Sequence, residues 1–290
     1  MGCAKPLKAW QTDQGGIVWS EKGKIARELE LPCGKCRLCR LSLARSWAIR
    51  CVHESKMHKH NVFATLTYDE KHYTPSLDYS HVQRWLKRLR KTTGQNIRYF
   101  VTGEYGDIEG RAHWHALLFG LRLDDRKKWS DKYWTSETLN KTWGAGSVMC
   151  GDVTYQSAAY CAKYAIKKRS GPIAEEYYTR VHRITGEVFR VEPEMAHMSL
   201  KPAIGKTWFQ KYWKDVYMAR DGVVIDNKVL PPPTYYKEML KSIDMDLSDE
   251  REYDRYVKSE EFAKDCTPER LEARERVAAA REKLNKRRIG

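Results

Sequence analysis

The strongest constraint on the fold is a pair of apolar segments joined by a short turn. The first segment, NIRYFVTGE, ends at Glu104, and the second, RAHWHALLFG, begins at Arg111. Between them lies YGDIEG, whose glycines are typical of a tight connection between strands. The pattern predicts an antiparallel hairpin. Its second strand is apolar on both faces from Ala116 to Phe119, which is typical of a central strand.

Further elements follow from hydrophobic periodicity and turn residues. In 80–91, Val82, Trp85 and Leu89 mark one apolar helical face, and Ser80 with Gln83 fits a capping box. After residue 39, Leu43, Trp47 and Cys51, with the nearby Ala44, Ala48 and Val52, recur at a spacing of three and four residues and predict an amphipathic helix. The other predictions are a strand in 61–70, a helix or irregular lid in 125–144, a short strand in 146–153 and a helix from 154 to Gly171. Residues 1–32 show no clear period.

These elements predict an α+β fold, with a single antiparallel sheet and helices packed on it. We expect a cysteine-containing N-terminal segment with a basic amphipathic helix in 1–60 and a main domain in 61–240. A charged helical tail follows in 241–290, where Thr267 caps a helix that begins at Pro268.

The net charge restricts the class of partner. The chain of 290 residues carries a formal charge of +15, which favours a polyanion, most commonly nucleic acid. No stretch approaches the roughly 20 apolar residues of a membrane span, and the N-terminus lacks the apolar core of a secretory signal. We therefore expect a cytoplasmic protein that makes no use of a membrane.

The two histidines of the second strand predict a metal site. Side chains alternate along a strand, so His113 and His115 share one face, with Cα atoms about 7 Å apart. Glu104 becomes a third ligand if the hairpin register places it opposite His113, whereas a slip of one residue would turn it away. The alternative is that the histidines are ordinary hydrogen-bonded residues.

Two tyrosines four residues apart predict a nucleophile pair. Tyr160 and Tyr164 lie on one face of a helix, and Lys163 and Lys167 each follow a tyrosine by three residues. With a pKa of about 10, a phenol needs a general base, neighbouring cations or a metal-polarised electrophile to attack at neutral pH. Tyrosines at this spacing more often pack against a core.

Three cysteines with C-x2-C-x2-C spacing indicate a second site. Cys33, Cys36 and Cys39 lack the further cysteine at position 43 that an iron–sulfur cluster of ferredoxin type would use. A structural zinc ion needs Cys51 or His53 as its fourth ligand. The alternative is that Cys51, on the apolar helix face, is a buried thiol.

The order of these motifs resembles that of a known family. The strand FATLTY, the later HWH and the helical YCAKYAIKK resemble the HUH endonucleases, rolling-circle replication initiators in which two histidines flank a hydrophobic residue. Residues 32–54, 103–120 and 160–168 are similar to the initiators of gokushovirus-type microviruses, which are small single-stranded DNA phages. The resemblance covers about residues 32–170 and departs at Ala112, where it implies a proline.

The resemblance implies Mg²⁺ or Mn²⁺ on His113, His115 and Glu104, although these ligands in isolation would suit Zn²⁺. It implies that a tyrosine attacks the DNA, leaving a free 3′-OH and a 5′-phosphotyrosine, while the second tyrosine serves rejoining. Lys163 and Lys167 would hold the phosphate. The DNA-binding residues would include Arg111, Lys168 and Arg169.

The resemblance also implies two partners, namely a single-stranded DNA origin, which could form a hairpin, and a host helicase or polymerase. The place of action would be the bacterial cytoplasm. Two other functions compete with the nicking enzyme. One is a non-catalytic protein that binds single-stranded nucleic acid on the same scaffold. The other, a zinc hydrolase of small molecules, leaves the +15 charge unexplained.

Overall fold

A computed structural model describes residues 2–106, 110–164, 172–181 and 185–286. The chain forms two compact units. The first combines residues 1–43 with 240–290, and the second comprises residues 44–239.

The second unit contains a seven-stranded sheet in which every pairing is antiparallel. Its strands, in spatial order, are β12 (Met195–Met198), β5 (Arg98–Tyr105), β6 (Ala112–Phe119), β4 (Asn61–Leu66), β9 (Val148–Gly151), β8 (Trp134–Ser136) and β7 (Arg126–Lys128). The hairpin predicted from the sequence is the β5–β6 pair, with β6 inside the sheet.

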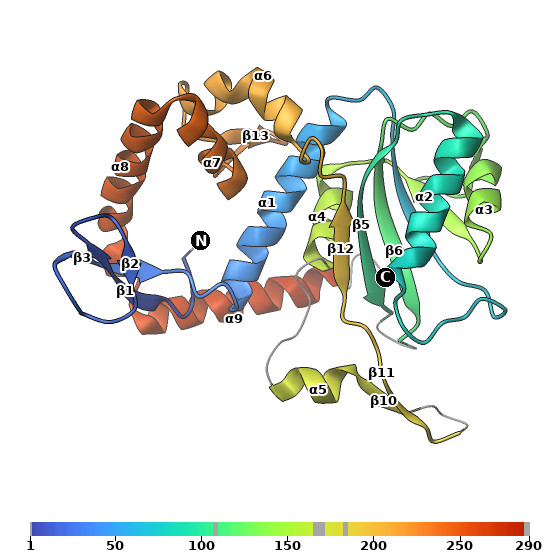
Figure 1. Ribbon diagram of the computed structural model, residues 1–290, viewed down its shortest axis with the longest axis horizontal. Coiled ribbons are helices and arrows are strands. Elements are labelled where there is room, and N and C mark those ends of the chain that lie inside the picture. The colour runs from blue at the N-terminus through green and yellow to red at the C-terminus, as the bar shows by residue number, and fades with distance from the viewer. Residues whose placement is uncertain (1, 107–109, 165–171, 182–184, 287–290) are drawn as a thin grey trace. The chain divides into compact units, whose positions relative to one another are not determined.

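Helices cover both faces of this sheet (Figure 1). On one face lie α2 (Tyr79–Thr93), α3 (Glu137–Trp143) and α5 (Pro172–Tyr178), and on the other lie α1 (Arg37–Ser55) and α4 (Tyr155–Tyr164). The helices α6 (Lys206–Tyr217) and α7 (Thr234–Ile243) follow later in the chain. Two short hairpins, β10 (Thr179–Val181) with β11 (Val188–Arg190) and β13 (Val223–Ile225) with β14 (Lys228–Leu230), accompany them.

The alternation of β6 separates two hydrophobic cores. Trp114 and Leu118 point to the face covered by α2 and α3, whereas Leu117 and Phe119 point to the face covered by α1 and α4. The histidines of β6 have the same parity as Leu117. They therefore lie on the α1 and α4 face.

Two predicted helices are present, with differences in detail. In α2, Val82, Trp85, Leu86 and Leu89 are buried as expected, but the helix is capped by Asp78, which accepts from the Ser80 backbone N–H. The capping box predicted for Ser80 is therefore wrong, because the N-cap lies two residues earlier, at Asp78.

In α1, the buried stripe runs through Ala44, Ala48 and Cys51. Leu43 is 50% exposed, so its expected place on the apolar face is wrong. It lies one residue before Ala44, which turns it about 100° around the helix from the buried stripe.

The first unit contains a three-stranded sheet, helices and a 3₁₀ turn. Its elements are β1 (Leu7–Thr12), β2 (Ile17–Val18), β3 (Ile25–Leu31), α8 (Met245–Glu261), the 3₁₀ turn η1 (Ala263–Asp265) and α9 (Pro268–Lys286). The charged C-terminal helices are as predicted, and the Thr267 hydroxyl accepts from the Arg270 N–H at the start of α9. The sheet was not expected, because its short strands bury only Ala9 and show no clean alternation.

The segment 125–144, predicted as a helix or irregular lid, instead forms β7, β8 and the short helix α3. The α+β class with a large antiparallel sheet is confirmed, although the described residues also form three smaller sheets. Among the described helices, none has both the length and the apolar character needed to cross a bilayer.

Candidate active site and metal centre

The register of the β5–β6 hairpin brings three candidate metal ligands together. Glu104 pairs with His113, and Thr102 pairs with His115. This is the register on which the third ligand depended, so Glu104 shares a face with both histidines. Gly103 allows the tight fit on the opposite face, since a Cβ atom there would lie 2.7 Å from the Trp114 ring.

Both imidazoles contact one carboxylate oxygen. The Nε2 atoms of His113 and His115 lie 2.9 Å and 2.8 Å from Oε1 of Glu104. A hydrogen bond on the opposite side of the imidazole ring fixes the orientation of His113, since its Nδ1 donates to the Arg111 carbonyl oxygen at 3.1 Å. The Thr65 hydroxyl lies 3.0 Å from Nδ1 of His115.

Glu104 is buried, yet it is held as a carboxylate. Burial alone would raise its pKa, but hydrogen bonds from His113 and His115 and their positive charge outweigh burial and lower the pKa of Glu104 to about 2. Glu104 itself therefore remains ionised over the whole physiological pH range.

These residues fit a divalent cation. The candidate ligand atoms of Glu104, His113 and His115 all lie within 4.8 Å of one another. The proton that His113 donates to the Arg111 carbonyl leaves Nε2 as the atom directed to the site, which is the arrangement of a metal-binding histidine. Imidazole and carboxylate ligands suit Mn²⁺ and Zn²⁺, and the carboxylate also suits Mg²⁺.

Tyr160 reaches this centre from α4. Its hydroxyl donates to Oε1 of Glu104 at 3.4 Å. The phenol ring meets the rings of His115 and Phe63 edge to face, at centroid distances of 4.8 Å and 6.4 Å. The helix is positioned by small buried residues, Ala158, Cys161 and Ala162, which let α4 approach the sheet closely.

The other predicted residues of this helix are described only in part. Lys163 is partly buried on α4, one residue before the last residue of the helix, Tyr164. The side chain of Tyr164 lies outside the described residues, as do Lys167, Lys168 and Arg169.

Arg111 lies at the start of β6, beside the histidines. Its guanidinium pairs with Glu70, donates to the Tyr68 carbonyl oxygen at 3.2 Å and stands 5.2 Å from the centroid of the Tyr73 ring. Its side chain remains 33% exposed. A cation and an aromatic ring thus lie together near the candidate metal ligands.

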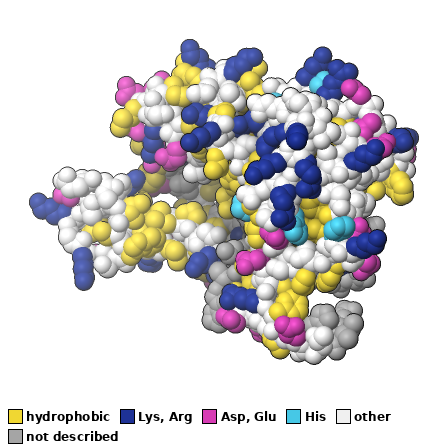
Figure 2. All heavy atoms as spheres, turned by 45° about the vertical axis from the view of Figure 1, so that its right-hand side comes forward, with side chains coloured by type: hydrophobic (Ala, Val, Ile, Leu, Met, Phe, Trp, Pro, Cys, Tyr) yellow, Lys and Arg dark blue, Asp and Glu magenta, His cyan; other side chains and the backbone are white. Residues whose placement is uncertain are grey.

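A basic surface and a cavity lie on the α2 side of the unit. Figure 2, in which this side comes forward, shows clusters of lysine and arginine side chains with histidines among them. The cavity has a volume of about 460 Å³ and is lined by residues that include Tyr68, Tyr73, His81, Arg84 and Arg88.

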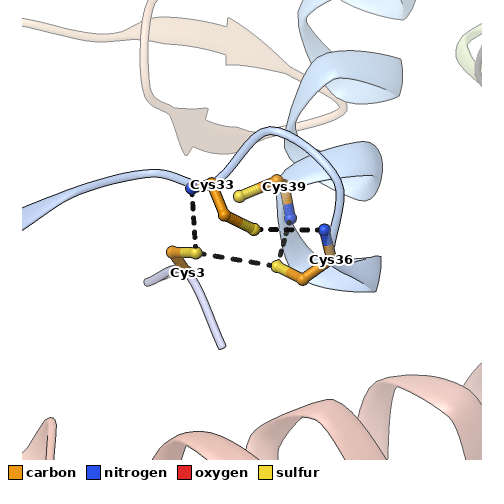
Figure 3. A group of neighbouring side chains, drawn as sticks. All are labelled: Cys3, Cys33, Cys36 and Cys39. Carbon is orange, nitrogen blue, oxygen red and sulfur yellow. Dashed lines mark hydrogen bonds between the residues drawn. The ribbon is translucent and has the colours of Figure 1, made fainter. Parts of the chain in front are cut away.

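The cysteines cluster as expected, but with a different fourth member. Cys3 joins Cys33, Cys36 and Cys39 (Figure 3), and the four sulfur atoms lie within 4.8 Å of one another. The expected zinc ligand Cys51 is instead buried in the core between α1 and the sheet, where burial raises the pKa of its thiol.

His53, the other expected fourth ligand, is also excluded by its position. It is buried, lies 3.0 Å from the Tyr236 hydroxyl and stacks on Trp208.

Sequence reasoning missed Cys3 and Thr65. The incomplete three-cysteine set was itself a signal for Cys3, since it called for a fourth thiol elsewhere in the chain. Thr65 is paired with His115 across β4 and β6, and neither a motif nor its local pattern indicated that it would hold a ligand.

Comparison with known proteins gives consistent matches. A family model described as replication-associated protein ORF2/G2P matches residues 61–169. The replication-associated protein VP4 of Bdellovibrio phage phiMH2K is 38% identical over 260 residues, covering 83% of this chain and 78% of that protein. ORF2 of Spiroplasma virus 4 is 30% identical over 273 residues, covering 83% and 81%.

A third relative, the replication-associated protein ORF4 of Chlamydia phage 1, is 26% identical over 238 residues, covering 77% of this chain and 56% of that protein. No solved structure matches the chain. The extent of the first two matches shows that this chain belongs to the family of replication-associated proteins of gokushovirus-type microviruses.

Proposed function

We propose that this protein initiates rolling-circle replication by nicking and rejoining single-stranded DNA at an origin, as an HUH endonuclease of the two-tyrosine type. The observation that carries the proposal is the convergence of the Tyr160 hydroxyl and both histidine Nε2 atoms on one oxygen of Glu104. The proposed endonuclease domain is residues 61–240, and the site of action is the host cytoplasm.

In this proposal, Glu104, His113 and His115 hold Mg²⁺ or Mn²⁺. The ion, when bound, neutralises negative charge on the non-bridging oxygens of the scissile phosphate. The donor set favours Mn²⁺ over Mg²⁺, because imidazole is a better ligand for the former.

The chemical step assigned to Tyr160 is an in-line displacement at phosphorus. The phenolic oxygen forms a bond to phosphorus, the bond from phosphorus to the 3′ oxygen breaks, and the phenolic proton passes to solvent while the 3′ oxygen takes up a proton. The products are a 5′-phosphotyrosine and a free 3′-OH for a host polymerase. Tyr164 is proposed to act in rejoining, and Lys163 and Lys167 to hold the phosphate.

Strand binding is assigned to the basic and aromatic residues around the site. Arg111, with Tyr73 beside it, is proposed to contact the strand, as are Lys168 and Arg169. Base stacking on aromatic rings and phosphate contacts by cations are the usual means of holding single strands. Binding should weaken with salt, with a log–log slope of about −0.7 for each neutralised phosphate.

The decisive experiment incubates the full chain and Mn²⁺ with single-stranded oligonucleotides that tile the genome encoding it. We expect a protein–DNA adduct that survives boiling in SDS and that maps, by mass spectrometry, to the peptide containing Tyr160 and Tyr164. The double variant Tyr160→Phe with Tyr164→Phe should form no adduct. The control Tyr155→Phe, on the same helix, should still form it.

Binding without an adduct would favour the non-catalytic alternative, and an adduct on another residue would refute the assignment of the tyrosines. Replacement of both His113 and His115 by Ala should abolish nicking while DNA binding persists. Nicking retained in that variant would remove the histidines from the mechanism.

A further inference from the structure

We propose that Cys3, Cys33, Cys36 and Cys39 bind a structural zinc ion, at a site separate from the Glu104, His113 and His115 centre. The four sulfur atoms lie within 4.8 Å of one another, and those of Cys3 and Cys36 are 3.8 Å apart. Tetrahedral zinc with Zn–S bonds of about 2.3 Å places its sulfur ligands about 3.8 Å apart. Figure 3 shows the four side chains grouped between the start of the chain and the start of α1.

The backbone around the cluster has the form of a thiolate cage. Backbone N–H groups donate to three of the sulfurs, and such donors offset the negative charge that metal-bound thiolates carry. The sulfur of Cys3 accepts from the N–H groups of Cys33 (3.2 Å) and Lys5 (3.3 Å). The sulfur of Cys33 accepts from the Cys36 N–H (3.3 Å), and the sulfur of Cys36 accepts from the N–H groups of Ala4 (3.4 Å) and Cys39 (3.5 Å).

The loop that carries the cysteines is shaped for this purpose. Gly34 adopts φ of 71°, a left-handed conformation that favours glycine, and it turns the chain between Cys33 and Cys36. The Arg40 N–H donates to the Cys36 carbonyl oxygen at 3.0 Å, so Cys36 lies at the first turn of α1. The positive end of that helix further favours thiolates.

The fourth ligand is delivered by the small sheet. β1 pairs with β3 in a register that sets Leu7 opposite Leu31. Cys3 and Cys33 therefore extend from neighbouring strand ends, although 30 residues separate them. This pairing completes a set of four thiolates with no position open to water, which is the composition of a structural zinc site.

A metal cross-link would add stability that the hydrophobic interior of the first unit supplies only in small part. Its hydrophobic interior is small, and the described residues of this unit that are buried are Ala9, Cys36, Leu38, Leu240, Ser248 and Leu271. Small units that bury little apolar surface commonly depend on a metal or on disulfides. Zinc would join the start of the chain to α1, where the Arg37 N–H also donates to Glu275 of α9 at 3.1 Å.

The proposal is tested first by metal content. The full chain, purified without chelators, should contain a single zinc ion per chain by mass spectrometry of its metals. Cys3→Ala should lower the affinity for zinc by at least roughly 100-fold, because loss of a ligand costs no less than loss of a supporting hydrogen bond. Cys266→Ala, a cysteine of the same unit outside the cluster, should retain the zinc.

The variant that replaces both His113 and His115 by Ala separates the two sites. It should keep its zinc, since its cysteines are intact. Loss of the zinc in this variant, or its retention in Cys3→Ala, would overturn the proposal, as would a chain that binds iron in place of zinc.

A second measurement needs no variant. Iodoacetamide should label Cys3, Cys33, Cys36 and Cys39 only after a zinc chelator is added, and hydrogen exchange in β1 and β3 should then accelerate. Equal labelling with and without chelator, or disulfides among these cysteines, would refute a zinc site.

Discussion

At the scale of single residues, the candidate centre depends on which atom of each imidazole is held. The two Nδ1 atoms face a backbone carbonyl and the Thr65 hydroxyl, and this leaves both Nε2 atoms directed at Glu104. A residue that only orients a ligand is therefore as necessary to the geometry as the ligand itself.

Replacing Thr65 by Val should weaken Mn²⁺ binding about 10- to 100-fold, because the substitution removes the hydrogen-bond partner of His115 and keeps the β-branched shape. Isothermal titration calorimetry measures the change. Thr67→Val, whose hydroxyl contacts Ser147 instead, is the matched control and should leave the affinity unchanged. Equal affinities for the Thr65 variant and the native chain would exclude an orienting role for Thr65.

At the scale of elements, β6 serves two cores with one alternating pattern. One face of the sheet packs on α2 and α3, whereas the other carries the histidines and is covered by α1 and α4. The large side chains on the α2 side supply stability, and the small side chains of α4 allow Tyr160 to come close to the centre. Both faces contain a hydrophobic core, but the candidate site lies only on the face covered by α1 and α4.

Leu89→Ala in α2 should lower the free energy of unfolding by about 2–5 kcal/mol, because Leu89 is fully buried and its loss leaves a cavity. The exposed neighbour Lys91 is the control, and Lys91→Ala should change stability by no more than about 0.5 kcal/mol. Urea unfolding measures both. Below the unfolding transition the Leu89 variant should keep its Mn²⁺ affinity, and loss of that affinity would contradict the separation of the two faces.

At the scale of the whole molecule, a buried carboxylate connects distant parts of the second unit. Glu54 of α1 accepts from the Arg98 guanidinium at 2.5 Å and from the Gly205 N–H at 2.7 Å, and its carboxylate lies 3.2 Å from Nε2 of His58. Gly205 has φ of 78°, and a Cβ atom there would lie 2.6 Å from the Tyr236 hydroxyl, so glycine is required.

The charge of Glu54 should make stability depend on pH. Burial alone would raise its pKa, but hydrogen bonds from His58, the Gly205 N–H and Arg98 lower the pKa below its ordinary value of 4.5. A depressed pKa means that the stabilisation is present above pH 4.5 and is lost as the pH falls through the lower, folded-state pKa. At pH 7, Glu54→Ala should cost about 3–5 kcal/mol, since it leaves Arg98 without its buried partner.

The measurement is urea unfolding of Glu54→Ala and of the native chain between pH 7 and pH 3. The difference between them should narrow as the pH falls below 4.5. Glu137→Ala, which removes an exposed partner of Lys141, should leave the stability nearly unchanged at every pH. A difference for Glu54→Ala that is constant over the whole range would show that its charge contributes nothing.

Local patterns in the sequence were sufficient for much of this site. The alternation in 111–120 and the turn before it predicted the hairpin and the shared face of His113 and His115, both of which are present. The register that brings Glu104 to the same face was left open by the sequence, and the structure supplies it. The helix predicted from residue 154 is present as α4 and carries Tyr160, although its predicted end at Gly171 lies outside the described residues. These features have periods of two and 3.6 residues, so a short stretch of chain contains the information that specifies them.

The tertiary structure alone decided which distant residues meet. Cys3 replaced Cys51 as the fourth member of the cysteine cluster because β1 pairs with β3, whereas α1 turns Cys51 into the core. Likewise, Thr65 reaches His115, and Tyr160 reaches Glu104, only after strands and helices far apart in the chain have packed. Such contacts depend on register and close packing across long loops, and a local pattern carries no record of either.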